Sequence, residues 1–463
     1  MLKRLMPLAA LLLAFALVAA ACGDDDDATT TTAGGGGEGT TTTEAMETTT
    51  TAGGGETTTT AATAAGVACD EPVKVGLITD ETGPLAIYGA HILRSFPIGM
   101  EYVTGAAGTD GKYMLENCEI QVIVKDDQSN PENTATVGRE LIEVDGVDIL
   151  VGTVSSGATA SLQELAADNN VILIAAPAAA TDITGKDFDP NTFRASRHNY
   201  QDSMAICDQF VNVDGMKTFV QIAPDYSFGY GGAQAYKDAC TFFGGEFIAD
   251  DVFAPADTTD FTSYLEPLAN SGADAFLVTW AGGGFVPLDQ AARDLSVIND
   301  TTVLGSPFVD NVVMPAFFAN AIGTTSVILY HYTAPQGNEI NDYLIAKAAE
   351  AGAIPDLFDA DGMNAAIMIG EALKATGGAA DADSLRAALE GMTFEGPKGT
   401  IVIRAEDHTA IQDMYIVTLV NVDDPEFKYY EYVNTVRPEP PCLLEGEYVD
   451  RCGSLPVGTL TGG

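Results

Sequence analysis

Small and hydroxyl-bearing residues gather in one stretch, Thr153-Val154-Ser155-Ser156-Gly157, between an apolar β-rich run and the start of a helical pattern. The first N–H groups of a helix have no partner within the helix, and the helix dipole is positive at that end. The stretch could therefore bind an anion such as a carboxylate. The alternative, which the spacing favours equally, is that Ser155, Ser156 and Thr159 only cap the helix.

Motifs for catalysis or cofactor binding are weak. Asp126-Asp127 ends a predicted strand and could be an acid/base pair, but adjacent strand-end carboxylates without a nearby histidine are more often solvated or capping. Gly229-Tyr230-Gly231-Gly232 opens a helix, yet Gln234 stands where a dinucleotide loop needs its third glycine, which favours a tight turn. No Gly-x-Ser-x-Gly or P-loop motif occurs, and the four histidines lack metal-ligand spacing. We expect no enzyme, no cofactor and no metal.

β-rich runs alternate with helical patterns around these candidates, which predicts a doubly wound α/β fold. A first unit has predicted strands at 73–79, 119–125, 147–152 and 171–176. A second unit has predicted strands at 218–223, 246–253, 273–280, 302–305 and 327–332. Helices at 339–351, 361–376 and 384–390 and strands at 399–404, 414–420 and 428–433 follow. The chain is therefore expected to return to its first unit and to form two lobes with a cleft between them, and ligands bind at the carboxyl ends of such strands.

The N-terminal residues have the layout of an exported chain. Residues 1–21 combine Lys3 and Arg4 with an apolar run and three alanines, which predicts a signal peptide. We favour lipid attachment at Cys22, and thus anchoring to the outer face of the bacterial cytoplasmic membrane, over ordinary cleavage before a free Cys22. Residues 22–66, rich in Thr, Gly and Asp, predict a flexible linker. No later run is apolar for long enough to span a membrane.

Composition excludes two classes of protein. The chain has 66 acidic and 21 basic residues among 463, and its net charge is −45. Such a chain has no basic surface for nucleic acid. With 46% hydrophobic residues, it is also not a disordered acidic chain. Most of the negative charge belongs to the folded part and not to the linker.

Beyond Cys22, six cysteines remain, as expected for an exported protein. Six cysteines allow 15 connectivities. We favour three bridges from their predicted positions, around the first two strands, on the helices flanking one strand and in the tail. The favoured pairs are Cys69 with Cys118, Cys207 with Cys240, and Cys442 with Cys452.

Several short motifs occur between Val73 and Val420, and they are strong only in combination. They are Val73–Thr79, Thr82-Gly-Pro-Leu-Ala-Ile-Tyr-Gly89, Lys125–Pro131, Val151–Ser156, Asp260-Phe-Thr262 with Gly272–Ala275, and Gly396-Pro-Lys-Gly399. In this order they resemble the branched-chain amino-acid-binding proteins of ABC importers. The resemblance implies a type I periplasmic-binding fold, in which two doubly wound parallel-sheet lobes, joined by three hinge crossings, close over a small ligand. The expected division is a signal peptide at 1–21, a lipid-anchored linker at 22–66, lobe 1 at 67–196 plus 333–404, lobe 2 at 197–332 plus 405–435, and a tail at 436–463.

The resemblance also implies roles for single residues. Ser156 matches the serine that holds the ligand carboxylate, and Ala178 the residue whose carbonyl takes the ammonium. The threonine that contacts both groups aligns with Ala180 or, with a shift of one residue, with Thr181, which we prefer because it has a hydroxyl. Tyr88 matches a tyrosine at the mouth of the ligand cleft, and lobe 2 of the family usually presents an aromatic residue to the ligand where Phe228 stands. The predicted ligand-binding residues are Tyr88, Ser155, Ser156, Ala178, Ala179, Thr181, Phe228, Trp280 and Asp310.

Two positions leave the ligand open. Trp280, the only tryptophan, ends a predicted strand and could equally pack in the core or contact ligand. The family's acidic residue for the ammonium falls near Pro307, where no carboxylate stands, and Asp310 is the nearest substitute. Without that substitute, the ligand would be an amide, a urea-like compound or an aromatic acid.

The resemblance implies a monomeric solute-binding protein that captures a small carboxylate-bearing metabolite, first of all a branched-chain or related amino acid, and delivers it to a membrane permease. A ligand sensor with the same fold is one alternative. A hydrolase using Asp126 or Asp127 is another, against which the missing nucleophile and base count.

Overall fold

The computed structural model describes residues 66–306 and 310–462, which belong to one compact unit. The predicted signal peptide, Cys22 and nearly all of the linker lie outside the described residues. Within the described ranges, no helix is both long and apolar enough to cross a membrane.

The first sheet has six strands in the order β2-β3-β1-β4-β5-β6, and all its neighbours are parallel except β2 with β3. Its strands are β1 (Val73–Thr79), β2 (Lys112–Leu115), β3 (Cys118–Asp126), β4 (Ile149–Val151), β5 (Ile172–Ala175) and β6 (Thr192–Arg194). The helices between them are α1 (Ala86–Thr104), α2 (Pro131–Arg139) and α3 (Ser156–Asp168). The short strands β2 and β6 were not predicted from the sequence.

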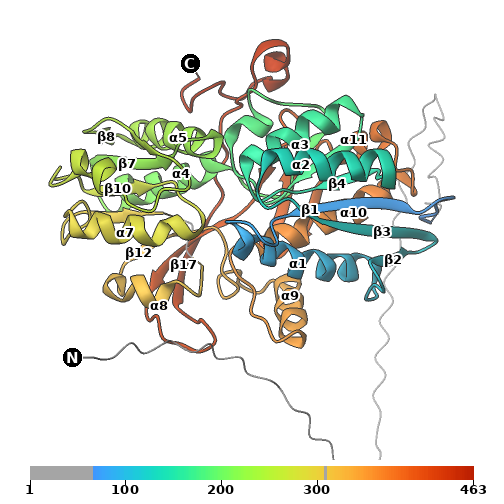
Figure 1. Ribbon diagram of the computed structural model, residues 1–463, viewed down its shortest axis with the longest axis horizontal. Coiled ribbons are helices and arrows are strands. Elements are labelled where there is room, and N and C mark those ends of the chain that lie inside the picture. Colours follow the sequence, from blue (N-terminus) through green and yellow to red (C-terminus); the bar gives the residue numbers. More distant parts are fainter. Residues whose placement is uncertain (1–65, 307–309, 463) are drawn as a thin grey trace, which may run out of the picture. The chain divides into compact units, whose positions relative to one another are not determined.

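Successive side chains of β1 point to opposite faces of the sheet, and apolar side chains on both faces need helices to cover them. Val75 and Leu77 belong to the buried cluster that contains Phe96 of α1. Ile78 belongs to a second cluster, with Leu162 of α3. Figure 1 shows α2 and α3 on one side of the sheet and α1 on the other.

The second sheet has the order β11-β10-β7-β8, with β9 also paired to β7. Its strands are β7 (Thr218–Pro224), β8 (Glu246–Phe247), β9 (Val252–Ala254), β10 (Ala275–Val278) and β11 (Val303–Gly305). The helices of this part are α4 (Asn199–Asp208), α5 (Ser227–Phe243), α6 (Thr262–Leu265), α7 (Phe285–Asp294) and α8 (Met314–Phe317). The single strand predicted at 246–253 is in fact two short ones, β8 and β9.

The last predicted strand of the second unit does not join this sheet. β12 (Thr325–Ile328) pairs antiparallel with β16 (Met414–Leu419), which pairs with β17 (Tyr430–Val436). Its register places Val327 opposite Ile416. The difference arises because a strand's partner is chosen by long-range packing, which a local β-rich run does not reveal.

The remaining elements return to the first sheet. They are α9 (Glu339–Glu350), α10 (Asp359–Thr376), α11 (Ala382–Leu389), β13 (Thr393–Gly396), β14 (Gly399–Ile403) and β15 (Ala410–Ile411). Helix α10 packs along α1, where Gly99 allows close approach because a β-carbon there would lie 2.7 Å from that of Ala366. The chain passes between the two parts after β6, after β12 and after β15. The predicted fold class, with two parallel-sheet lobes and three crossings, is confirmed.

Three disulfides close loops in both parts. Cys207 of α4 joins Cys240 of α5, and these helices pack together beside β7. The other bridges are Cys69–Cys118, at the first strands, and Cys442–Cys452, in the tail. These are the pairs that the sequence favoured.

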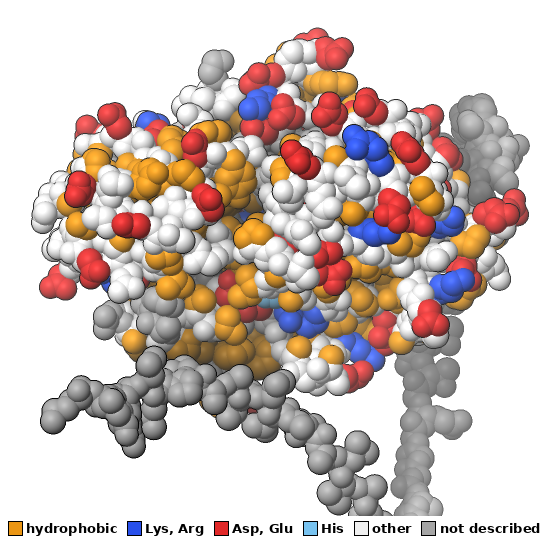
Figure 2. Space-filling model, viewed as in Figure 1, with side chains coloured by type: hydrophobic (Ala, Val, Ile, Leu, Met, Phe, Trp, Pro, Cys, Tyr) orange, Lys and Arg blue, Asp and Glu red, His pale blue; other side chains and the backbone are white. Residues whose placement is uncertain are grey.

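Figure 2 shows acidic side chains spread over the face in view. A charge distributed in this way affects solubility and long-range repulsion and says little about a small ligand.

Candidate functional site

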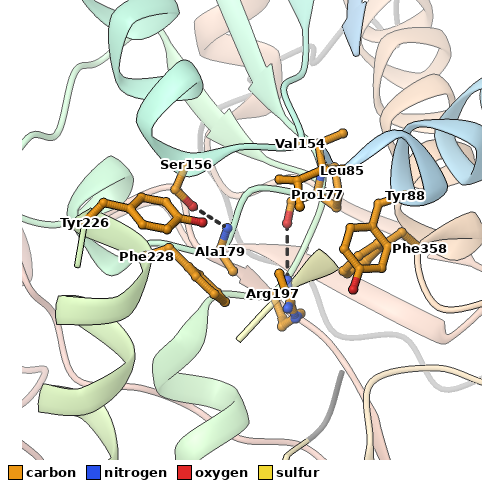
Figure 3. A pocket seen from close by; sticks show the side chains of 11 residues that line it. Leu85, Tyr88, Val154, Ser156, Pro177, Ala179, Arg197, Tyr226, Phe228 and Phe358 are labelled. Carbon is orange, nitrogen blue, oxygen red and sulfur yellow. Dashed lines mark hydrogen bonds between the residues drawn. The ribbon is translucent and has the colours of Figure 1, made fainter. Parts of the chain in front are cut away.

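A cavity lies where the carboxyl ends of both parallel sheets meet, as expected for ligand sites in open α/β sheets. Figure 3 shows residues that follow β4 and β5 facing residues that follow β7. The lining residues are Leu85, Tyr88, Val154, Ser156, Pro177, Ala179, Arg197, Tyr226, Phe228, Ala281 and Phe358. The cavity has a volume of about 30 Å³, far below the roughly 300–1,000 Å³ of typical ligand pockets. In this state it is too small to hold a metabolite.

The two serines of the serine loop differ in their contacts. Ser155 has extended backbone angles and caps α3, because its hydroxyl accepts from the N–H of Ala158 at 3.5 Å. Ser156, the next residue, lines the cavity. Capping by the first serine thus leaves the second available for a ligand.

The hydroxyl of Ser156 is oriented by the loop after β5. Its oxygen accepts from the N–H groups of Ala179 at 3.2 Å and Ala180 at 3.1 Å. A hydroxyl has two lone pairs and one proton. Because two donors already point at this oxygen, its own proton is left to donate elsewhere, and the cavity is next to it. Ser156 therefore presents a hydrogen-bond donor to the cavity.

A buried arginine holds the same loop from behind. Arg194 of β6 is fully buried and donates to the carbonyl oxygen of Ala178 at 2.7 Å, to that of Ala180, and to the hydroxyl of Thr184 at 2.8 Å. Burial lowers the pKa of Arg194 to about 9, so the guanidinium is still charged at neutral pH. An ammonium bound at the Ala178 carbonyl would meet this positive charge, which argues against the role that the resemblance implied for Ala178.

A second buried arginine lines the cavity itself. Arg197 donates from Nε to Asp202 at 3.2 Å and from Nη1 to the carbonyl oxygen of Pro177 at 3.2 Å, and its guanidinium lies 5.4 Å from the ring centre of Phe358. Burial raises the pKa of Asp202, and the positive charge of Arg197 opposes that shift. The sequence reasoning missed Arg197. One signal in the sequence could have identified it: Arg194, Arg197 and His198 form a group of basic residues, which is unusual in so acidic a chain.

Aromatic rings form much of the wall. Tyr88 lies edge-on to Phe358, with ring centres 5.1 Å apart, and its hydroxyl accepts from the N–H of Gly282 at 3.0 Å. Tyr226 and Phe228, whose ring centres are 5.9 Å apart, lie on the opposite side of the cavity. Gly89 fixes the position of Tyr88, because a β-carbon there would lie 1.7 Å from the carbonyl oxygen of Asp80. Only glycine therefore allows α1 to begin so close to the end of β1.

Four of the nine predicted ligand-binding residues line the cavity, and two more, Ser155 and Ala178, belong to the loops that carry Ser156 and Ala179. The four are Tyr88, Ser156, Ala179 and Phe228. Ser155 and Ala178 each stand one residue from a lining residue.

The other three lie elsewhere. Trp280 is 1% exposed and packs edge-on against Phe261 in the core of the second part, while its neighbour Ala281 lines the cavity. Thr181 faces Gly231 and a separate cavity beside the C-terminal tail. Asp310 lies behind Tyr88, facing His91.

The pair Asp126-Asp127 stabilises loops and is absent from the cavity lining. Asp126 accepts from the N–H of Glu81 at 2.9 Å and from the hydroxyl of Thr82 at 2.6 Å. Asp127 is buried and accepts from Ser129 and Thr134, both at 3.0 Å. These contacts match the capping interpretation and leave the hydrolase alternative without support.

Comparison with known proteins places this geometry in context. Residues 72–424 match the family model described as "Periplasmic binding protein". Leu/Ile/Val-binding protein homolog 6 of Brucella abortus is 25% identical over 374 residues, which cover 78% of this chain and 91% of that protein. The crystal structure of an ABC-type branched-chain amino acid transporter from Rhodopseudomonas palustris is 32% identical, with a TM-score of 0.66 over 79% of this chain and 96% of that one. An ABC transporter solute-binding protein from the same species, solved in complex with 3,4-dihydroxybenzoic acid, is 27% identical, with a TM-score of 0.68 over 79% of this chain and 97% of that one.

Proposed function

The chain belongs to the periplasmic binding protein family, and from this premise we propose that it is the extracytoplasmic receptor of an ABC importer for an aromatic carboxylic acid. One observation carries the choice of ligand: among the described residues, no acidic side chain lines the cavity, whereas a buried guanidinium and a serine donor do. The donors suit a carboxylate, and that lining contains no carboxylate to pair with an ammonium.

The carboxylate would lie against the start of α3. There it would accept from the hydroxyl of Ser156 and from the first N–H groups of the helix, within the positive field of the helix dipole and of Arg197. These donors are fixed in place before ligand arrives, because Ala179 and Ala180 hold the Ser156 oxygen. Local donors can therefore outweigh the acidic surface, whose field is screened beyond about 10 Å at 0.1 M salt.

The apolar remainder of the ligand would lie between aromatic rings. Tyr88 and Phe358 stand on one side and Tyr226 and Phe228 on the other. Offset or edge-on pairs of rings contribute about 0.5–1.5 kcal/mol beyond the burial of their area. The relative solved with 3,4-dihydroxybenzoic acid supports this class. A branched-chain amino acid is the second candidate, which the Leu/Ile/Val-binding relatives favour.

Closure supplies the mechanism. Ligand binds first to the serine loop and is then contacted by Tyr226, Phe228 and Ala281, which follow strands of the other sheet. The closed state becomes favoured by the difference between the ligand's affinities for the two states. A membrane permease then receives the ligand from a monomer held at the membrane by lipid on Cys22. The predicted residue ranges of the two lobes remain part of this proposal.

A thermal-shift screen tests the ligand class, since a ligand that binds only the native state raises its stability by about 2.7 kcal/mol at 100 times its Kd. We expect benzoate and 3,4-dihydroxybenzoate to raise the Tm. Benzamide, which lacks the carboxylate, and phenylalanine and leucine, which carry an ammonium, should leave it unchanged. A larger shift with leucine than with the benzoates would contradict the proposal and favour the second candidate.

Replacing Ser156 tests the carboxylate site. Ser156→Ala removes a donor to a charged group, so we expect affinity for the best acid to fall by about 1.5–3 kcal/mol, roughly 10- to 150-fold. Isothermal titration calorimetry measures this change. Ser263→Ala, at an exposed position of α6, is the matched control and should bind like the wild type. Equal affinities of Ser156→Ala and the control would refute the site.

A further inference from the structure

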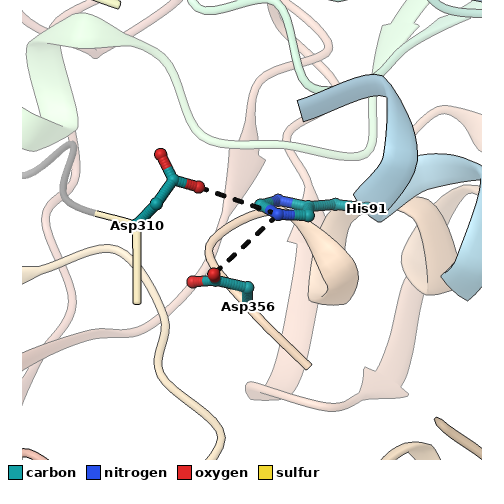
Figure 4. Close-up of side chains that lie close together, drawn as sticks. All are labelled: His91, Asp310 and Asp356. Atoms are coloured by element: carbon teal, nitrogen blue, oxygen red, sulfur yellow. Dashed lines mark ion pairs between the residues drawn. The ribbon is translucent and has the colours of Figure 1, made fainter. Parts of the chain in front are cut away.

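Two carboxylates and an imidazole meet behind Tyr88, in a buried cluster of His91, Asp310 and Asp356. Nε2 of His91 lies 3.7 Å from Oδ1 of Asp310 and 3.9 Å from Oδ2 of Asp356 (Figure 4). All three residues are buried or nearly so, and their potential ligand atoms lie within 4.8 Å of one another. His91 belongs to α1 and Asp356 precedes α10, which packs on α1, whereas Asp310 follows β11 of the other sheet. The cluster therefore spans both parts of the molecule.

The two carboxylates differ in their hydrogen bonds. Asp356 accepts from the N–H of Leu357 at 2.8 Å and from that of Asn311 at 3.1 Å. Oδ1 of Asp310 has no hydrogen-bond partner among the described residues, although the residue is only 4% exposed. The hydroxyl of Tyr88 interacts with Asp310 and offsets part of this deficit. Two neighbouring buried carboxylates are costly to ionise together, and a proton on one of them removes this cost.

We propose that Asp310 takes up a proton when the two lobes close beside the ionised Asp356, and that this proton makes closure sensitive to pH. The proposal rests on the lobe closure proposed above but not on the identity of the ligand. Asp356 is the better place for the negative charge because backbone N–H groups already point at it. Burial and the charge of Asp356 raise the pKa of Asp310, in agreement with this assignment.

A divalent cation fits the cluster less well. Nδ1 of His91 accepts from the N–H of Phe358 at 3.4 Å, so the neutral ring carries its proton on Nε2, the atom that faces both acids. A metal at Nε2 would need the opposite tautomer. The nearby guanidinium of Arg94 would also repel a cation.

Other charged and titratable groups surround the cluster. They are Tyr88 and Arg94 of α1, Asp359 of α10, Tyr330 next to β12, and Tyr429 and Tyr430 at β17. Burial raises the pKa of each tyrosine, so the phenols stay neutral near pH 7. Burial also raises the pKa of Asp359 to about 7, but Asp359 pairs with Arg94 across α1 and α10. Because these helices stay together, that titration is not coupled to opening.

The direction of the pH effect follows from the raised pKa. The closed state binds a proton that the open state, with a hydrated Asp310, releases near its ordinary pKa. Between these two pKa values, each rise in pH therefore favours the open state. Loss of protons should separate the lobes and weaken ligand binding.

Small-angle X-ray scattering of the ligand-free protein tests this directly. We expect a larger radius of gyration at about pH 8.5 than at about pH 5.5. Asp310→Asn, which imitates the protonated acid, should abolish the difference, and Asp356→Asn should reduce it. Asp300→Asn removes one exposed charge of the same kind and should retain the full difference.

Two outcomes would overturn the proposal. One is a pH effect that persists unchanged in Asp310→Asn and Asp356→Asn. The other is closure that requires added Zn²⁺ and is reversed by a chelator, which would make the cluster a metal site. Because no ligand is used, a wrong ligand class affects neither result, and the screen with acids remains an independent test.

Discussion

Arg197→Met is expected to lower the free energy of unfolding by about 3–5 kcal/mol, the scale for removing one partner of a buried ion pair. Arg197 is 1% exposed and its Nε lies 3.2 Å from Oδ1 of the buried Asp202. The substitution keeps much of the apolar volume but removes the hydrogen-bonded counter-charge of Asp202 and leaves it only the more distant charges of Lys398 and Arg194. Ligand affinity should fall as well, since the guanidinium lines the cavity. Urea unfolding measures the first effect and calorimetry the second.

Two further variants separate charge from packing. Arg139→Met changes an exposed arginine of α2 and should cost no more than about 0.5 kcal/mol. Combining Arg197→Met with Asp202→Asn removes both charges, so the double variant should be more stable than Arg197→Met alone. A double variant as unstable as the single one would show that packing, and not the ion pair, sets the effect.

Arg194→Met is expected to destabilise the protein by about 2–5 kcal/mol, because each buried acceptor left without a donor costs roughly 1–3 kcal/mol. The acceptors are the carbonyl oxygens of Ala178 and Ala180 and the hydroxyl of Thr184. The same loop donates to Ser156, so ligand affinity should fall although Arg194 does not line the cavity. Urea unfolding measures the loss of stability, and calorimetry measures the loss of ligand affinity.

The conservative variant Arg194→Lys makes this prediction specific. Lysine retains a positive charge, but its compact ammonium cannot reproduce the planar fork that reaches three acceptors. We expect Arg194→Lys to lose much of the stability that Arg194→Met loses, whereas Arg139→Met again serves as the surface control. Wild-type stability and affinity in Arg194→Lys would mean that charge alone matters at this position.

The two arginines also bear on the choice of ligand. Arg194 already occupies the carbonyl of Ala178, and Arg197 adds a second buried guanidinium at the cavity. Both features favour an anion and disfavour an ammonium. The absence of a carboxylate at Pro307 suggested the same in the sequence. The serine loop therefore remains consistent with the family, while amino-acid specificity becomes the weaker candidate.

The sequence by itself determined most of the elements and the region of the candidate site. Short β-rich runs predicted β1, β3, β5 and β10, and helix-start signals predicted that the serine loop opens a helix. Both patterns are local, because a buried strand is marked by a short apolar run and a helix cap needs only its own neighbours. Since ligands bind at the carboxyl ends of parallel strands, the cavity's position followed from the strand order.

Only the tertiary structure decided which side chains face that cavity. Trp280 points into the core while Ala281 faces the cavity, and Thr181 faces α5. Arg197 and Asp310 contact residues of distant segments. Arg197 lies over the ring of Phe358, and Asp310 lies next to His91. In loops, side-chain direction has no period, and contacts between distant segments are fixed by packing and burial. A single sequence carries the periodic signals, but these long-range contacts exist only once the chain has folded.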